Sequence, residues 1–229
     1  MGTDAENTQT THDRLLAAAC ELFGEMGYRE TTVAEICSRA NANIAAVNYH
    51  FRSKDDLYVA AWRHSFDVSL RAHPPDGGIP ADAPPEARFR GRVLALLQRM
   101  LDPACHEFRI VSHEMAHPTG LLVEVLHEAI LPLREAMLNS IRELTGDTVD
   151  ERTCHFCMMS IMSQCLHLVH GEWHRRIFQS SRHPVRPPEP ANVTVEELAE
   201  HIVRFSLAAI RGIAQEERTG RDNGEGVAG

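Results

Sequence analysis

Apolar residues recur with the period of an α-helix along almost the whole chain, and this pattern restricts the possible folds more than any other feature. Leu15, Ala18, Ala19, Leu22 and Phe23 form one such apolar stripe, which closes at Gly27. Similar stripes follow up to about residue 215, whereas no run of alternating β-branched residues and no internal repeat is present. The sequence therefore predicts an all-α fold of about nine helices.

Two proline-rich segments interrupt the helical pattern. The stretch "HPPDGGIPADAPPE" at 73–86 holds five prolines and two glycines, and "SRHPVRPPEPANVT" at 181–194 is the second. Pro118 is expected to end one helix, and Pro132 to kink or break another. The polar segments 1–10 and 217–229 are predicted to be disordered tails.

Composition narrows the class of protein. The 229 residues include 43% hydrophobic and 24% charged residues, which is ordinary for a soluble globular protein. The net charge is -9, but residues 31–65 carry four basic against three acidic residues and are the least acidic region. The polar N-terminus resembles no signal peptide, and no apolar run is long enough for a membrane span. The six cysteines do not form a disulfide framework, so we expect free thiols in a reduced cytoplasmic compartment.

Helix-start signals crowd the segment between residues 31 and 58. Thr32 with Glu35 three residues later is a capping-box pattern before a short helix, Val33–Ala40. Asn41 suits a left-handed turn conformation, Asn43 can cap the helix "IAAVNYHF", and Ser53 can cap a fourth helix that runs to about Arg71. Two short helices joined by a tight turn and supported by a preceding helix predict a helix-turn-helix.

The second helix of this motif is unusual for an exposed surface because it carries small and polar residues without acidic ones. Alanine methyl groups can contact thymine methyl groups, and an asparagine such as Asn48 can bind adenine through two hydrogen bonds. Tyr49 and Lys54, the only lysine in the chain, can reach phosphates. The alternative is a small helical bundle without a role in DNA binding.

The stretch "TTVAEICSRANANIAAVNYHFRSKDDLY" resembles the signature of the TetR family of bacterial transcriptional regulators. The match comprises Thr32, Ile36, Ala40, His50, Phe51, Ser53, Lys54 and Leu57. The chain departs from the family pattern at Asn41, Ala42, Asn43 and Asp55, and Asn48 and Tyr49 replace the commoner Tyr and His. Farther on, "SHEMAHPT" and the pair Gln164–Cys165 resemble segments of the C-terminal domain in one subgroup of the family.

The resemblance implies a helix-turn-helix domain over 11–58 and a helical ligand-binding and dimerisation domain over 59–216. It implies a ligand-responsive regulator without enzymatic activity, most simply a homodimeric repressor that a small-molecule effector releases from a double-stranded DNA operator. Carried over residue by residue, Thr32 lies near the DNA backbone and Asn43 to His50 form the recognition helix. The expected DNA-contacting residues are Thr32, Asn43, Ile44, Ala45, Ala46, Asn48, Tyr49, His50 and Lys54.

The same resemblance directs attention to two surfaces of the second domain. The last two long helices would pair with a second subunit, through Phe156, Ser160, Ser163, His167, Leu198, Ile202, Phe205 and Ala209; an intramolecular core is the alternative for these stripes. An effector pocket would be apolar and rich in sulfur. Its candidate residues are Phe108, Met115, Leu122, Leu126, Met158, Met162, Cys165 and Leu166.

Two competing hypotheses involve metal or redox chemistry. His113-Glu114-x-x-His117 matches the H-E-x-x-H pattern of zinc hydrolases, but Pro118 follows directly and Val123 occupies the place of a third ligand. Cys154, His155, Cys157, Cys165, His167, His170 and His174 concentrate in the segment 154–174, which leaves a metal- or redox-responsive regulator open. We expect no metal and no cofactor.

Overall fold

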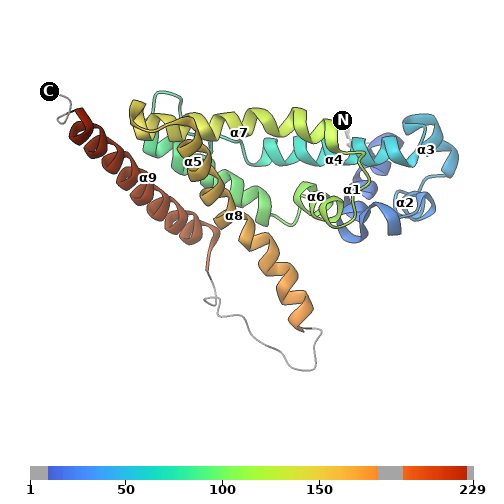
Figure 1. Cartoon of the computed structure of the whole chain (residues 1–229). Coiled ribbons are helices and arrows are strands. Elements are labelled where there is room, and N and C mark those ends of the chain that lie inside the picture. The colour runs from blue at the N-terminus through green and yellow to red at the C-terminus, as the bar shows by residue number, and fades with distance from the viewer. Residues whose placement is uncertain (1–9, 180–192, 226–229) are drawn as a thin grey trace, which may run out of the picture. The chain divides into compact units, whose positions relative to one another are not determined.

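A computed structural model describes residues 10–179 and 193–225, without the side chains of 147, 167–179 and 221–225. These described residues form nine α-helices, one short 3-10 helix and no strand (Figure 1). The helices are α1 (Thr11–Glu30), α2 (Val33–Arg39), α3 (Ile44–Phe51), α4 (Lys54–Ala72), α5 (Pro85–Leu101), α6 (Glu107–Ala116), α7 (Val123–Thr145), α8 (Glu151–Gln179) and α9 (Val195–Glu225), with η1 at Gly146–Thr148. The predicted all-α fold is confirmed. Among the described helices, none has the length and apolar character needed to cross a lipid bilayer.

Two helices extend farther than the sequence pattern indicates. Helix α7 continues through Pro132, so the chain does not break there. Helix α9 continues to Glu225, so it covers most of the segment from 217 that is predicted to be disordered. The Thr219 hydroxyl donates to the Gln215 carbonyl at 3.0 Å, a bond between successive turns of this extension. Residues 1–9, most of the second proline-rich segment and 226–229 lie outside the described residues.

The chain packs into two compact units, each made of separate stretches of sequence. The first contains the residues up to Ala72 together with Pro103–Ala129, and the second contains His73–Asp102 and the residues from Ile130 onward. Packing thus keeps all of α4, and α6 as well, with the helix-turn-helix. The functional boundary predicted at residue 58 stays a prediction.

In the first unit, α1 packs against α4 and α6 around an aromatic core. Phe23 and Tyr58 are fully buried and meet edge to face, with ring centroids 4.8 Å apart. Trp62 stacks on Phe66 one turn farther along α4, with centroids 5.1 Å apart. Large aromatic side chains bury much apolar area and prefer such defined geometries, so this core holds α4 at a fixed position on α1.

In the second unit, the core is aliphatic and rich in sulfur, and α9 lies along α5 and contacts α8 (Figure 1). Ion pairs join helices that are far apart in sequence: Arg90 with Glu200, Arg211 with Glu86, and Arg88 with Glu143. The buried core residues are Phe89, Val93, Leu97, Met137, Leu138, Ile141, Cys154, Cys157, Met158, Ile161, Cys165, Ala199, Ile202, Val203 and Ile210.

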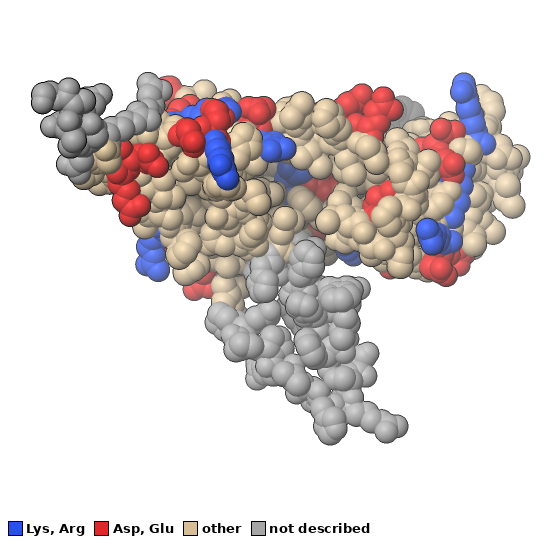
Figure 2. All heavy atoms as spheres, viewed as in Figure 1, with Lys and Arg blue, Asp and Glu red and all other residues tan. Residues whose placement is uncertain are grey.

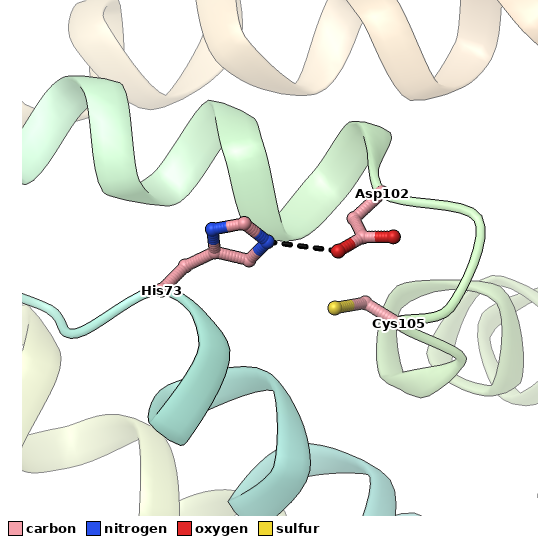
Figure 3. Close-up of side chains that lie close together, drawn as sticks. All are labelled: His73, Asp102 and Cys105. Carbon is pink, nitrogen blue, oxygen red and sulfur yellow. Dashed lines mark hydrogen bonds and ion pairs between the residues drawn. The ribbon is translucent and has the colours of Figure 1, made fainter.

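The segment 73–102 belongs to the second unit, and its first and last residues contact each other. His73 Nε2 lies 2.8 Å from Asp102 Oδ2, so the first and last residues of the segment are joined (Figure 3). Within the segment, the loop approaches α5 so closely that a Cβ atom on Gly77 would lie 2.6 Å from the carbonyl oxygen of Gly91. Gly77 also has a φ of 66°, a conformation that favours glycine. These two glycines therefore permit the loop to pack directly on the helix.

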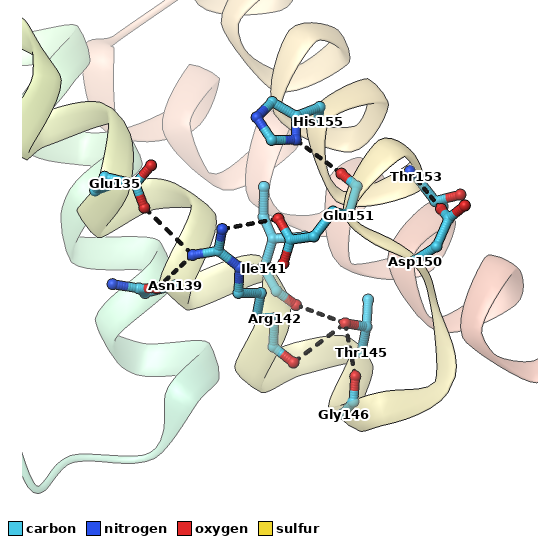
Figure 4. Close-up of polar contacts among 10 residues, drawn as sticks. All are labelled: Glu135, Asn139, Ile141, Arg142, Thr145, Gly146, Asp150, Glu151, Thr153 and His155. Carbon is cyan, nitrogen blue, oxygen red and sulfur yellow. Dashed lines mark hydrogen bonds and ion pairs between the residues drawn. The ribbon is translucent and has the colours of Figure 1, made fainter.

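A polar network fixes the connection between α7 and α8 (Figure 4). Both Arg142 Nε and Nη2 donate to the Glu151 carboxylate at 2.8 Å, and Nη1 donates to Asn139 at 2.6 Å and to Glu135 at 3.3 Å. These contacts raise the pKa of Arg142 and lower the pKa of Glu151. Because Arg142 and Glu151 stand on either side of the turn, their paired bonds bring the two helices together there.

Candidate nucleic-acid interface

The helix-turn-helix begins with the caps that the sequence predicts. The Thr32 side chain accepts from the Glu35 N–H at 3.2 Å, and the Glu35 carboxylate accepts from the Thr32 N–H at 2.8 Å, which completes the capping box. The Thr32 hydroxyl, 2.7 Å from the Glu35 carboxylate, and the Thr32 N–H together lower the pKa of Glu35. In the turn, Asn41 has a φ of 48°, and Asn43 Oδ1 accepts from the Ala46 N–H at 2.9 Å to cap α3. Short-range polar bonds thus set the start of α2 and of α3.

Helix α3 has one buried face and one exposed face. Val47 and Phe51 are buried, while Asn43, Ile44, Ala45, Asn48, Tyr49 and His50 are exposed and Ala46 is half-buried. Tyr49 is 83% exposed, which is high for an aromatic side chain. Of the predicted DNA-contacting residues, those on α3 therefore share a surface that is open for contact with a groove of DNA. Thr32 is also exposed, at the start of α2.

Directly after α3 the backbone adopts a strained turn. Arg52 has φ 66° and ψ -48°, and the Ser53 N–H donates to the Phe51 carbonyl at 2.7 Å, which is a γ-turn with a positive φ. The backbone strain of a residue other than glycine in such a conformation is about 1–3 kcal/mol. Ser53 then caps α4, since its hydroxyl accepts from the Asp56 N–H at 3.0 Å. The predicted Ser53 cap is confirmed, whereas the strain at Arg52 has no signal in the sequence.

Lys54, the first residue of α4, lies on an aromatic ring. Its Nζ is 4.1 Å from the centroid of the Tyr28 ring, and the Tyr28 hydroxyl in turn donates to Asp55. Burial lowers the pKa of Lys54, and the hydrogen bond to Asp55 raises the pKa of Tyr28 to about 12. The ring positions the ammonium group, because a cation is attracted to an aromatic face at this distance. Its contact with phosphate stays a prediction.

Basic and acidic side chains are mixed around this region. Figure 2 shows Lys and Arg around α2 and α3, with Asp and Glu between them. Arg39 of α2, for example, lies 3.1 Å from Glu21 and 3.5 Å from Glu25. The exposed face of α3 itself carries no acidic residue. Local composition therefore distinguishes the candidate interface better than total charge does.

A polar groove of about 540 Å³ runs beside α3. One wall consists of the turn at 41–43 and the outward residues of α3, including Tyr49 and His50; the other consists of Thr11 and Arg14 from the first turn of α1. Sequence analysis missed these two residues. The contact that brings Arg14 here, to the Ala40 carbonyl, joins residues 26 positions apart, and no local pattern reveals it.

The H-E-x-x-H match has a structural explanation. Glu114 is only 8% exposed, and its carboxylate accepts from the Tyr58 hydroxyl at 3.1 Å and from the Thr119 and Gly120 N–H groups at 2.9 and 3.0 Å. Helix α6 ends at Ala116, so His117 lies outside it with a φ of -137°. Glu114 thus fixes the turn after α6 and joins it to α4, with both of its carboxylate oxygens accepting hydrogen bonds.

The Cys- and His-rich helix gives little support to metal or redox sensing. Among the described side chains of α8, up to Leu166, no three metal-ligating groups come together. Cys154, Cys157 and Cys165 are buried in the core, and burial raises the pKa of each thiol, to about 12 for Cys165. A redox sensor needs a lowered thiol pKa, and burial shifts the pKa of these thiols in the opposite direction. The side chains of His167, His170 and His174 lie outside the described residues.

The predicted effector-contacting residues are divided between the two units. In the first unit, Leu122 is buried, Phe108 and Leu126 are half-buried, and Met115 is 75% exposed. In the second unit, Met158 and Cys165 belong to the core, Met162 packs against it, and Leu166 is exposed. Their role in binding an effector stays a prediction, and Met115 has the least burial to support it.

The predicted dimer residues fall into two classes. The first class is exposed and comprises Phe156, Ser160 and Ser163 on α8 and Phe205 and Ala209 on α9. Ile202 is buried, and Leu198 packs against the same core, so these two side chains contact their own unit. The side chain of His167 is not among those described.

Comparison with known protein families gives one match in the N-terminal segment and another in the C-terminal segment of the chain. Residues 15–61 match the family described as bacterial regulatory proteins, tetR family. Residues 85–210 match the C-terminal domain of the HTH-type transcriptional dual regulator CecR. The CecR of Shigella flexneri is 33% identical over 150 residues, which span 61% of this chain and 67% of that protein.

Solved structures share the fold at lower identity. AibR, determined in complex with isovaleryl coenzyme A and operator DNA, has a TM-score of 0.65 at 17% identity, over 86% of this chain and 97% of that one. PfmR, a TetR family transcriptional regulator from Thermus thermophilus, has a TM-score of 0.61 at 18% identity, over 86% and 98%. With more than half of its length matched by the CecR C-terminal domain and its helix-turn-helix matched by the N-terminal model, the chain belongs to the tetR family of bacterial transcriptional regulators.

Proposed function

We propose that this regulator is a homodimeric repressor that binds a near-palindromic operator and is released by a small-molecule effector. The observation that carries the proposal is the exposed face of α3, which is free of acidic residues and is fixed at both ends by caps and turns. Such a helix can enter the major groove, with Asn48 reading a base edge and Tyr49 and Lys54 contacting phosphates. Because a bacterial operator lies in the cytoplasm, we expect the protein to act there.

Exposed apolar side chains on the last two helices support a dimer. Phe156 on α8 is 53% exposed, and Phe205 on α9 is 58% exposed. Met159 is also exposed, next to small residues on α8 that permit close approach of another helix. Because large exposed aromatic side chains mark contact surfaces, we expect the subunit interface here and leave Leu198 and Ile202 in the internal core.

Release by an effector needs two conformations with different affinities for DNA. An effector that binds more tightly to the conformation with low DNA affinity lowers occupancy of the operator. The ratio of its affinities for the two conformations sets the size of the effect. The complex of AibR with an acyl coenzyme A and operator DNA supports a small-molecule effector, and the name of CecR as a dual regulator makes activation the alternative outcome.

Footprinting on the DNA upstream of the protein's own gene tests the proposal. We expect a protected, near-symmetric site whose binding weakens as salt increases. Absence of any salt-sensitive protection would contradict the DNA-binding role. Transcription assays with and without candidate effectors then distinguish repression from activation.

Sedimentation measures the predicted assembly separately. The wild-type protein should sediment as a dimer, and Phe156→Arg should shift it toward the monomer because the substitution introduces a charge into the apolar face. Leu131→Arg, which introduces the same charge at an exposed apolar position of α7, serves as a control. A wild-type monomer at micromolar concentration would refute the dimer.

A further inference from the structure

Beside α3, the first turn of α1 forms one wall of a polar groove of about 540 Å³. The opposite wall includes Ala45, Ala46 and Tyr49, which belong to the face expected to enter the major groove of DNA. Because a duplex carries a sugar–phosphate strand along each edge of that groove, a strand that follows α3 would run beside the first turn of α1.

Arg14 is held in a defined orientation on this wall. Its Nε donates to the Ala40 carbonyl at 3.1 Å, and its Nη2 donates to the Thr11 hydroxyl at 3.2 Å. These two contacts, both to neutral oxygen atoms, set the orientation of the guanidinium group. The residue is half-buried, so less side-chain freedom is lost when a ligand binds.

The groove has the polarity that a phosphate requires. Its lining contains the Arg14 guanidinium, hydroxyl groups of Thr11 and Tyr49, and asparagine side chains, and it contains no carboxylate from the described part of the chain. The acidic residue nearest in sequence, Asp13, is engaged elsewhere: its Oδ2 accepts from the Thr10 N–H at 3.4 Å, and its Oδ1 lies 3.2 Å from His12 Nδ1. A guanidinium group beside hydroxyl groups offers the positive charge and the hydrogen-bond donors that bind a phosphodiester group.

We infer that Arg14 and Thr11 bind a backbone phosphate of the operator and thereby set the register of α3 in the major groove. The inference rests on the proposed DNA-binding function and adds to it a contact from α1. Arg14 supplies the charge-assisted bond and Thr11 the hydroxyl donor. The Ala40 carbonyl keeps the guanidinium at the junction between α1 and the end of α2.

The competing explanation is a purely structural role. A guanidinium at the carboxyl end of α2 also satisfies the Ala40 carbonyl and stabilises the helix dipole. That role predicts a loss of stability when Arg14 is replaced, but no change in the number of phosphates bound. The two explanations therefore separate in the salt dependence of DNA binding.

The experiment uses the full-length protein and a duplex selected by the wild type from a random-sequence library. Binding is measured by fluorescence anisotropy at several KCl concentrations for Arg14→Gln, Arg14→Lys and the control Arg39→Gln. The glutamine keeps an amide donor for Ala40 but removes the charge, and Arg39 lies outside the groove lining and pairs with Glu21 and Glu25. Chemical denaturation of each variant reports folding.

We expect Arg14→Gln to weaken binding at least about tenfold, the size of a lost charged hydrogen bond. The slope of log affinity against log salt should fall by about one per subunit, and Arg14→Lys should retain the wild-type slope. Arg39→Gln should leave the slope unchanged. A folded Arg14→Gln protein with the wild-type slope would overturn the inference while leaving the proposed function intact.

A second measurement identifies the phosphate directly. Single phosphates of the selected duplex are replaced by neutral methylphosphonates, and the loss of affinity is compared between the wild type and Arg14→Lys or Arg14→Gln. One position in each half-site should weaken the wild type and leave Arg14→Gln unaffected. Equal losses for both proteins at every position would overturn the inference, and failure of the wild type to select any duplex would overturn the proposed function with it.

Discussion

The helix-turn-helix and the core of the second unit are stabilised over very different distances along the chain. In the helix-turn-helix, Thr32 with Glu35, Asn43 with Ala46 and Ser53 with Asp56 are each three residues apart. In the second unit, Arg90 and Glu200 are 110 residues apart, and the core combines side chains of four helices. Local bonds therefore define the candidate interface, whereas long-range burial defines the second unit.

Removing a side chain from the long-range core should have the largest effect on stability. Leu138 is fully buried in the second unit, so Leu138→Ala should lower the free energy of unfolding by about 2–5 kcal/mol. Leu131→Ala, at an exposed position of the same helix, is the matched control and should change it by less than about 1 kcal/mol. Equal losses in urea denaturation would contradict the view that burial of Leu138 in this core stabilises the second unit.

Base reading should be confined to the locally defined region. Asn48→Ala should remove about 1–3 kcal/mol of discrimination at one position of the operator, because an asparagine can bind adenine through two hydrogen bonds. Affinity is measured on a set of operators with single base-pair changes, with Ser38→Ala of α2 as control. If all operators weaken equally, Asn48 is not a base reader.

The phosphate contact predicted for Lys54 should affect all sequences alike. Lys54→Ala should reduce affinity for every duplex and lower the salt slope by about one per subunit. Arg71→Ala, at the opposite end of α4, should leave the slope unchanged. An unchanged slope for Lys54→Ala would mean that the contact of its ammonium group with Tyr28 is structural only.

A local cap should contribute less to stability than a core residue. Thr32→Ala removes the capping box of α2 and should lower the free energy of unfolding by about 0.5–2 kcal/mol. Thr32→Ser keeps the hydroxyl and should restore most of the loss. A loss as large as that of Leu138→Ala would show that the two regions do not differ as described.

The smallest effect is expected at the exposed polar network between α7 and α8. Arg142→Ala should lower the denaturation midpoint slightly, and the difference from the wild type should shrink at about 1 M salt because salt screens exposed ion pairs. Arg134→Ala, on the same helix, is the control. A salt-independent loss would indicate that Arg142 acts through packing rather than charge.

The contrast also explains which predictions succeeded. The caps at Thr32, Asn43 and Ser53 and the turn at Asn41 could be predicted because each depends on residues a few positions away. The helices of the second unit could be predicted, but their neighbours could not. On α9, Leu198 and Ile202 pack inward while Phe205 and Ala209 are exposed, although all four belong to one apolar stripe.

The sequence by itself determined the all-α class, the helix-turn-helix and the outward face of α3, since periodicity and capping are properties of neighbouring residues. Only the tertiary structure decided that Glu114 accepts hydrogen bonds from the turn after α6, and that Arg14 lies beside α3. Both depend on partners brought together from distant parts of the chain. A helical period shows which face is apolar, but it does not show which neighbour covers that face.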